Sequence, residues 1–255
     1  MSLSPGRRTV LVVQPDHEDP LELFDSVFRS SGVAATIVRP FDGEPVPRQV
    51  EADGLVVLGG DMGANDDHEY PWLADVRHLL RVAVDEQVPT LGICLGGQLL
   101  AAACGGTVAR GEAGVEVGAV PIDPRPEASD DSLVGQITWP ATYATMHRDA
   151  IVSLPTDAVW LAESGMYPHQ AFRLGQCAWG LQFHPEVSLS RFRRWADHLS
   201  DDAETSRRMQ HGTAEFALNS RQVAVSAHEL ATGFARILRE HEGVPHSPSS
   251  REPTA

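Results

Sequence analysis

Short apolar runs alternate with helical stretches through the first half of the chain, and this alternation limits the folds available to it. The apolar runs cover residues 9–13, 34–38, 54–60 and 89–93, with helices expected at 20–30 and 72–85. Strands that are apolar along their whole length are buried on both faces, as in a parallel sheet covered by helices on two sides. The sequence therefore predicts an α/β fold with an open, mostly parallel central sheet flanked by helices.

The pattern changes from about Gly106, where short strands interrupted by Gly and Pro predict mixed or antiparallel additions to the sheet. Helical sequence returns after about residue 189, first to 199 and then across 203–240 in one or two pieces. The last residues, EGVPHSPSSREPTA, have the Pro/Ser-rich composition of a disordered tail. We therefore predict a main domain over 1–200, a C-terminal helical extension over 201–242 and a disordered tail over 243–255.

Composition argues against several classes of protein. The formal net charge of −15 disfavours a nucleic-acid partner, because binding to phosphates normally uses a basic face. No apolar run approaches the about 18 residues of a membrane span, and the opening MSLSPGRRTV has no cleavable apolar region. The three cysteines match no metal-binding spacing and cannot all pair within one chain. We expect a cytoplasmic protein with no nucleic-acid and no membrane partner.

Residues 92–96 read Gly-Ile-Cys-Leu-Gly, the cysteine form of a nucleophile elbow, between an expected strand and an expected helix. The sharp turn strains the nucleophile's backbone, so its neighbours must carry almost no side chain. The turn also places the sulfur at a helix N-terminus, which favours the thiolate. The segment predicts a reactive Cys94, and the alternative is a tight turn that holds a buried cysteine.

A thiolate that attacks an amide needs a general acid for the departing amine, and that acid needs an orienting partner. Phe183-His184-Pro185-Glu186 supplies both, because His184 is expected at the C-terminal edge of a strand and Glu186 can turn back toward its imidazole. Taken alone, this segment is also consistent with a surface histidine before a helix that starts at Pro-Glu.

GICLGGQ followed downstream by GLQFHPE resembles the class I glutamine amidotransferase family, and within it the glutaminase domains of GMP synthase. The resemblance covers roughly residues 8–199 and implies a flavodoxin-like fold. It also implies that Cys94 is the nucleophile, that His184 is the general acid and base, and that Glu186 orients His184.

The same resemblance implies an oxyanion hole and a substrate pocket. The backbone N–H groups of Gly60 and Leu95 match the positions that stabilise the oxyanion, and such donors contribute about 2.7–4 kcal/mol each in acyl transfer. Gln98 matches a glutamine that helps to hold the substrate, although an ordinary polar helix residue is the alternative. The segment that matches contacts to the α-amino and α-carboxylate ends of glutamine consists of Met146, His147, Arg148 and Asp149.

Two positions depart from the family pattern. Asp61 stands where many members have Pro after the Gly-Gly turn, and Arg148 stands where the GMP synthase branch has Gly. Both are expected near the pocket. Arg148 in particular predicts an altered pocket for the α-end, which would admit a γ-glutamyl compound other than free glutamine.

The resemblance implies hydrolysis of the glutamine side-chain amide through a γ-glutamyl thioester on Cys94, with no cofactor and no metal. The chain has no nucleotide-binding signature, so the ammonia acceptor is expected to be a separate synthetase subunit. Two alternatives remain open: a γ-glutamyl hydrolase or peptidase with the same triad, and a non-catalytic binding module.

Two further segments are not explained by these motifs. The acidic loop 61–71 is interpreted as a solvated loop near the pocket rather than a metal site. The helical extension is not part of the minimal family pattern, and its apolar positions predict packing on the domain or on another subunit. The possibility of a homo-oligomer therefore stays open.

Overall fold

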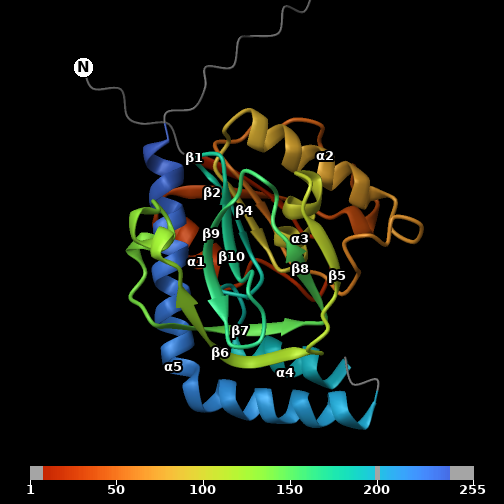
Figure 1. Cartoon of the computed structure of the whole chain (residues 1–255). Coiled ribbons are helices and arrows are strands. Elements are labelled where there is room, and N and C mark those ends of the chain that lie inside the picture. Colours follow the sequence, from red (N-terminus) through yellow and green to blue (C-terminus); the bar gives the residue numbers. More distant parts are fainter. Residues whose placement is uncertain (1–7, 199–201, 242–255) are drawn as a thin grey trace, which may run out of the picture.

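The structure is a computed structural model that describes residues 8–198 and 202–241 (Figure 1). Within these residues, a nine-stranded sheet has the strand order β2-β1-β3-β4-β11-β10-β9-β6-β7. The strands are β1 (Arg8–Val13), β2 (Val33–Val38), β3 (Leu55–Val57), β4 (Thr90–Ile93), β6 (Glu116–Pro124), β7 (Ala141–His147), β9 (Val159–Ser164), β10 (Ala171–Leu174) and β11 (Ala178–Leu181). The helices are α1 (Leu23–Ser30), α2 (Trp72–Asp85), α3 (Leu95–Ala103), α4 (Leu189–His198) and α5 (Ala203–Glu240).

The half of the sheet from β2 to β11 is entirely parallel, which confirms the predicted fold class. Alternate residues of β1 face opposite layers. Val10 and Val12 pack in the core cluster that holds α1 and the end of α5, while Leu11 and Val13 pack in the cluster that holds α2 and α3. Because both faces are covered, the strand is apolar at consecutive positions rather than at alternate ones.

The other half of the sheet is antiparallel, as the change of pattern near Gly106 predicts. Two further strands, β5 (Thr107–Arg110) and β8 (Asp149–Ser153), do not join the central sheet and pair with each other instead. This small second sheet leads the chain from β7 past the end of α3. It therefore brings the segment after His147 close to the elbow.

The C-terminal extension is one continuous helical segment, α5, which changes direction part-way along its length (Figure 1). Its first half packs Phe216 against Phe192 of α4, with ring centroids 5.0 Å apart. Its second half runs beside α1 and packs Phe234 against Phe28, with centroids 6.3 Å apart. The predicted boundary between residues 200 and 201 stays a prediction, and the predicted tail at 243–255 lies outside the described residues.

Replacing Phe234 by alanine is expected to lower the free energy of unfolding by about 3–5 kcal/mol, because its fully buried ring lies in the same core as β1. Urea unfolding followed by circular dichroism measures the change. Leu218→Ala on the same helix is the matched control, since Leu218 is 86% exposed and its loss should change stability by less than about 0.5 kcal/mol. Equal effects of the two substitutions would contradict the packing of α5 on the domain.

No helix within the described residues combines the length and the apolar composition needed to cross a bilayer. All three cysteines are free. The predicted cytoplasmic location stays a prediction.

Candidate active site

The turn between β4 and α3 holds Cys94 in a strained backbone conformation, with φ 50° and ψ −108°. A residue other than glycine adopts such angles only where its surroundings impose them. Here the Cys94 N–H donates to the carbonyl of Leu181 on the neighbouring strand at 2.8 Å, and the Cys94 carbonyl accepts from Gln98 N–H at 2.9 Å. The thiol therefore lies at the N-terminus of α3, as the elbow motif predicts.

Two glycines of the motif are required because backbone segments approach one another closely. A Cβ atom at Gly96 would overlap the carbonyl oxygen of Val57 on β3. A Cβ atom at Gly92 would lie 2.5 Å from the carbonyl oxygen of Gly96. Helix α3 can therefore start directly against the sheet only when these positions carry no side chain.

His184 and Glu186 meet beside Cys94. The backbone N–H of His184 donates to the carbonyl of Ala144 on β7 at 2.7 Å. In the side chain, His184 Nδ1 lies 2.8 Å from Glu186 Oε1. Both side chains are buried. Burial alone would lower the pKa of His184, but the Glu186 carboxylate and the Cys94 sulfur that face the imidazole raise this pKa well above its usual range. The arrangement favours the protonated, imidazolium form of His184.

Helix α4 covers the imidazole from one side, which the sequence did not predict. The ring of Trp195 lies with its centroid 4.8 Å from that of His184, and its Nε1 donates to the carbonyl of Glu18 at 2.9 Å. Such packing holds the imidazole in place and limits its contact with water. The sequence signal was a Trp on an amphipathic helix just after the His-Pro-Glu segment, which by itself indicates only core packing.

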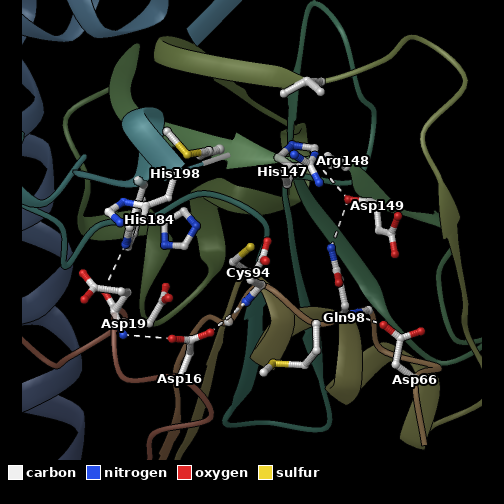
Figure 2. A pocket seen from close by; sticks show the side chains of 18 of the residues that line it. Asp16, Asp19, Asp66, Cys94, Gln98, His147, Arg148, Asp149, His184 and His198 are labelled. Carbon is white, nitrogen blue, oxygen red and sulfur yellow. Dashed lines mark hydrogen bonds between the residues drawn. The ribbon is translucent and has the colours of Figure 1, made fainter. Parts of the chain in front are cut away.

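A cavity of about 500 Å³ opens in front of Cys94 (Figure 2). Figure 2 shows Cys94 between two groups of side chains, with His184, Asp19 and Asp16 on one side and Gln98 and Asp149 on the other. The predicted site residues that line the cavity are Gly60, Cys94, Gln98, Met146, His147, Arg148, Asp149 and His184. The two that do not line it are Glu186, which lies behind His184, and Leu95, which acts only through its backbone in the prediction.

The two predicted oxyanion donors lie next to each other. Leu95 is the first residue of α3, so its N–H has no intrahelical acceptor. A Cβ atom at Gly60 would lie 3.0 Å from Leu95 Cδ2, which shows how closely the turn after β3 approaches the elbow. The geometry is consistent with the predicted oxyanion hole, whose role stays a prediction.

The amide of Gln98 holds other parts of the site in place. Its Nε2 donates to the carbonyl of Asp149 at 3.0 Å and to Gln182 Oε1 at 3.3 Å, and Gln182 Nε2 in turn lies 3.8 Å from Cys94 Sγ. Gln182 is part of the GLQFHPE segment but was not predicted as a site residue. The structure thus links Gln98 to the position of Asp149 and to Cys94, and a direct contact of Gln98 with substrate stays a prediction.

His147 lies in a buried polar network that the sequence did not predict. Its Nδ1 lies 2.9 Å from the carbonyl of Asp149, and its Nε2 lies 2.9 Å from Glu116 Oε2. Glu116 also accepts hydrogen bonds from Ser164 and Gln170. Both ring nitrogens of His147 therefore have protein partners, which fixes the turn from β7 into β8 beside the cavity.

Asp19 was also missed, because its loop after β1 carries no motif. Its side chain is only 8% exposed, and a Cβ atom at Gly59 would lie 2.5 Å from its Oδ1. Burial raises the pKa of Asp19 to about 8, His184 opposes this shift, and Glu186 adds to it.

Asp19, His184 and Glu186 each offer one ligand atom within 4.8 Å of the others, a set that could hold a cation. His184 Nδ1 is already hydrogen-bonded to Glu186, so we interpret the set as a hydrogen-bonded pair beside a protonated carboxyl group. The predicted absence of a metal stays a prediction.

Replacing Asp19 by asparagine is expected to change how stability depends on pH. The pKa of Asp19 is 3.8 for an ordinary aspartate and about 8 in the folded chain. Between these values the unfolded chain has released the proton and the folded chain still holds it, so the free energy of unfolding falls by about 1.4 kcal/mol per pH unit from this group. Urea unfolding at several pH values between about 5 and 7 should show that the free energy of unfolding of the variant, relative to that of the wild type, increases as pH rises. A difference that does not change with pH would contradict the buried, protonated state.

Sequence comparison places this site in a known family. The chain matches the family described as "Glutamine amidotransferase class-I" over residues 21–197. The chain belongs to the class I glutamine amidotransferase family. It is 32% identical over 148 residues to the glutamine-hydrolyzing GMP synthase subunit of Halobacterium salinarum, a match that covers 58% of this chain and 73% of that protein. It is also 30% identical over 170 residues to gamma-glutamyl peptidase 5 of Arabidopsis thaliana, over 65% of this chain and 67% of that protein.

Solved structures of the family have the same fold. A glutamine amidotransferase from Thermotoga maritima superposes with a TM-score of 0.78 at 26% identity, over 92% of this chain and 99% of that one. A glutamine amidotransferase from Methylobacillus flagellatus gives a TM-score of 0.77 at 26% identity, over 94% and 98%. The predicted family, its GMP synthase branch and the predicted fold are therefore confirmed.

Proposed function

We propose that this class I family member hydrolyses the side-chain amide of glutamine, or of a γ-glutamyl relative, through a thioester on Cys94. The observation that carries the proposal is the elbow thiol facing an imidazole that is hydrogen-bonded to a buried carboxylate at 2.8 Å. A nucleophile, a base within reach and a third group that orients the base are the elements of covalent acyl transfer. A non-catalytic binding module would have no need for this combination.

The reaction begins when Cys94 Sγ attacks the γ-carbonyl carbon of the substrate. Negative charge develops on the carbonyl oxygen, where the N–H groups of Gly60 and Leu95 would stabilise it by about 2.7–4 kcal/mol each. His184 donates its proton to the leaving nitrogen, the C–N bond breaks, and the amine departs. A water molecule then gives a proton to His184 and attacks the thioester, which releases glutamate and restores the thiol.

Glu186 acts on His184 throughout this cycle. Its hydrogen bond to Nδ1 leaves Nε2 for proton transfer and stabilises the imidazolium. The α-amino and α-carboxylate ends of the substrate would lie on the opposite side of Cys94, toward Gln98 and the segment from Met146 to Asp149. The substrate would then span the cavity with its γ-carbonyl at the thiol.

We further propose that released ammonia is used by a separate synthetase subunit. The glutamine-hydrolyzing GMP synthase subunit of Natronomonas pharaonis, 29% identical over 71% of this chain and 89% of that protein, is by name one part of such an enzyme. By analogy with that subunit, the acceptor would be another protein. Pull-down of the full chain from its own cells, with and without a glutamine analogue, would identify it.

A second candidate is a γ-glutamyl hydrolase that cleaves larger amides. A cavity of about 500 Å³ lies within the range of about 300–1,000 Å³ that accommodates larger ligands. Arg148 lines this cavity at the position where the GMP synthase branch has glycine. The similarity to gamma-glutamyl peptidase 5 supports the same candidate.

The test is glutamate release from free glutamine and from a panel of γ-glutamyl amides, together with mass spectrometry of the acid-quenched enzyme. We expect glutamate release and a glutamyl adduct on the peptide that contains Cys94. Cleavage of glutamine would favour the amidotransferase, and cleavage of larger amides alone would favour the hydrolase. No release and no adduct with any substrate would contradict catalysis by the isolated chain.

A further inference from the structure

Carboxyl groups gather in the part of the cavity that lies beside His184. They belong to the loop after β1 and the turn after β3, and they are Asp16, Glu18, Asp19 and Asp61. Figure 2 shows Asp16 and Asp19 below the imidazole, on the side of Cys94 that is opposite Gln98. This acidic part of the cavity is not explained by hydrolysis of free glutamine, whose leaving group is ammonia.

The direction of the proposed reaction assigns this part of the cavity to the leaving amine. His184 must reach the leaving nitrogen to protonate it, so the leaving group lies on the His184 side of the thiol. The two arginines that line the cavity, Arg110 and Arg148, belong to the other side, where Asp66 and Asp149 also line it. Arg148 precedes Asp149 in the chain, and Arg110 on β5 lies opposite Asp149 on β8 in the strand register of the second sheet. The two ends of the cavity thus differ in charge.

Asp16 is fixed as an acceptor by its neighbours. Its Oδ1 accepts from Glu18 N–H at 2.8 Å and its Oδ2 accepts from Asp61 N–H at 3.3 Å, which aligns the loop with the turn after β3. These hydrogen bonds come from neutral backbone groups and leave its charge uncompensated. The Glu18 carboxylate, by contrast, forms an ion pair with Arg191 at 2.7 Å.

Asp19 adds an independent observation. Its carboxyl group is more than nine-tenths buried, lines the cavity, and accepts no hydrogen bond from the residues that the structure describes. A buried polar group without a partner is costly unless a ligand supplies one. Asp19 therefore marks a place where a hydrogen-bond donor from the substrate fits.

We propose that the leaving-group side of the cavity recognises a cationic amine, so that the preferred substrates are γ-glutamyl amides of diamines. The amide nitrogen would lie at His184, and the distal ammonium group would lie between Asp16 and Asp19. Trp195, which lines the cavity beside His184, provides an aromatic surface that suits an alkylammonium chain. The proposal rests on the hydrolase form of the proposed function and names its substrate class.

The chemistry balances without any further reactant. The bond between the γ-carbonyl carbon and the amine nitrogen breaks, Cys94 takes the glutamyl group, and His184 supplies the proton with which the diamine leaves. Water then hydrolyses the thioester, so the sum is γ-glutamyl-diamine plus water to glutamate plus diamine. A diamine is a stronger base than the cavity carboxyl groups, so it keeps its charge at the distal end near neutral pH.

The test compares amides of similar length and different charge at low ionic strength. The full-length protein is given γ-glutamyl-1,4-diaminobutane, γ-glutamyl-butylamide and γ-glutamyl-4-aminobutyrate, with free glutamine as the reference. We expect kcat/KM for the cationic amide to exceed that for the neutral amide by about tenfold and that for the anionic amide by more. Added salt should reduce both ratios, because it screens the charges.

Asp16→Asn should reduce the preference for the cationic over the neutral amide by at least about threefold, because it removes a charge from this side of the cavity. Asp75→Asn is the matched control, since it removes the same charge from the exposed face of α2 and should leave the preference unchanged. Circular dichroism confirms that each variant is folded. If a variant does not fold, the charge preference and salt dependence of the wild type still test the proposal.

Equal kcat/KM for the cationic and neutral amides would overturn the proposal while leaving the proposed function in place. Cleavage of glutamine alone would have the same meaning. No cleavage of any substrate, including glutamine, would instead overturn the proposed function and this proposal with it. The outcomes therefore separate failure of the substrate class from failure of the catalytic assignment.

Discussion

Cys94→Ala should lower kcat/KM for any amide that the chain cleaves by at least about 10⁴-fold, because no other described group can form the thioester. The substitution removes one buried sulfur and leaves the hydrogen bonds of the turn, which are made by the backbone. The variant should therefore fold and bind substrate. Glutamate release under saturating substrate measures the loss, and the covalent adduct should disappear with it.

The other two cysteines provide the matched controls. Burial raises the pKa of the Cys104 thiol, and it raises the pKa of the Cys177 thiol to about 11. Neither thiol lines the cavity. Cys104→Ala and Cys177→Ala should each keep activity within about threefold of the wild type. Substantial activity of Cys94→Ala, or loss of activity in a control variant, would indicate that another residue is the nucleophile.

Glu186→Gln should lower kcat by about 10⁴-fold, by analogy with the loss of the orienting carboxylate in other triads. The amide is nearly the same size as the carboxylate, so the geometry is retained, but the charge that holds the imidazolium is removed. The Glu186 carboxylate raises the pKa of His184, and the substitution should therefore lower it. His184 acts as an acid toward the leaving amine. As pH rises, the variant should therefore lose activity at a lower pH than the wild type does.

The pH profile distinguishes this role from a merely structural one. Glu186→Asp keeps the charge at a greater distance and should recover part of the rate and most of the wild-type pH profile. If Glu186→Gln changed stability without moving the alkaline side of the profile, Glu186 would be a structural residue rather than an orienting one. An unchanged rate would remove it from the mechanism.

Local patterns in the sequence were sufficient for the fold class and for the central residues of the site. Strands such as β1 carry consecutive apolar residues, Val10 to Val13, because both faces of a parallel sheet are buried, and this pattern can be read without any contact information. The elbow around Cys94 and the segment from His184 to Glu186 are each contiguous, so their chemistry is visible in a few neighbouring residues. The helix at Trp72–Asp85 was predicted at its observed bounds because its pattern, too, is local in the sequence.

The tertiary structure decided what depends on chain segments that are distant in sequence. Asp19 acquires its burial and raised pKa only because the loop after β1 folds against Gly59 and the His184 segment. Trp195 and Glu116 likewise gain their roles from packing against His184 and His147. A side chain's charge state and partners are set by its three-dimensional surroundings, whereas strand burial and a sharp turn are set by the local order of residues. The sequence therefore determined the residues of the proposed catalytic centre, and the folded structure determined the shape and charge of the cavity around it.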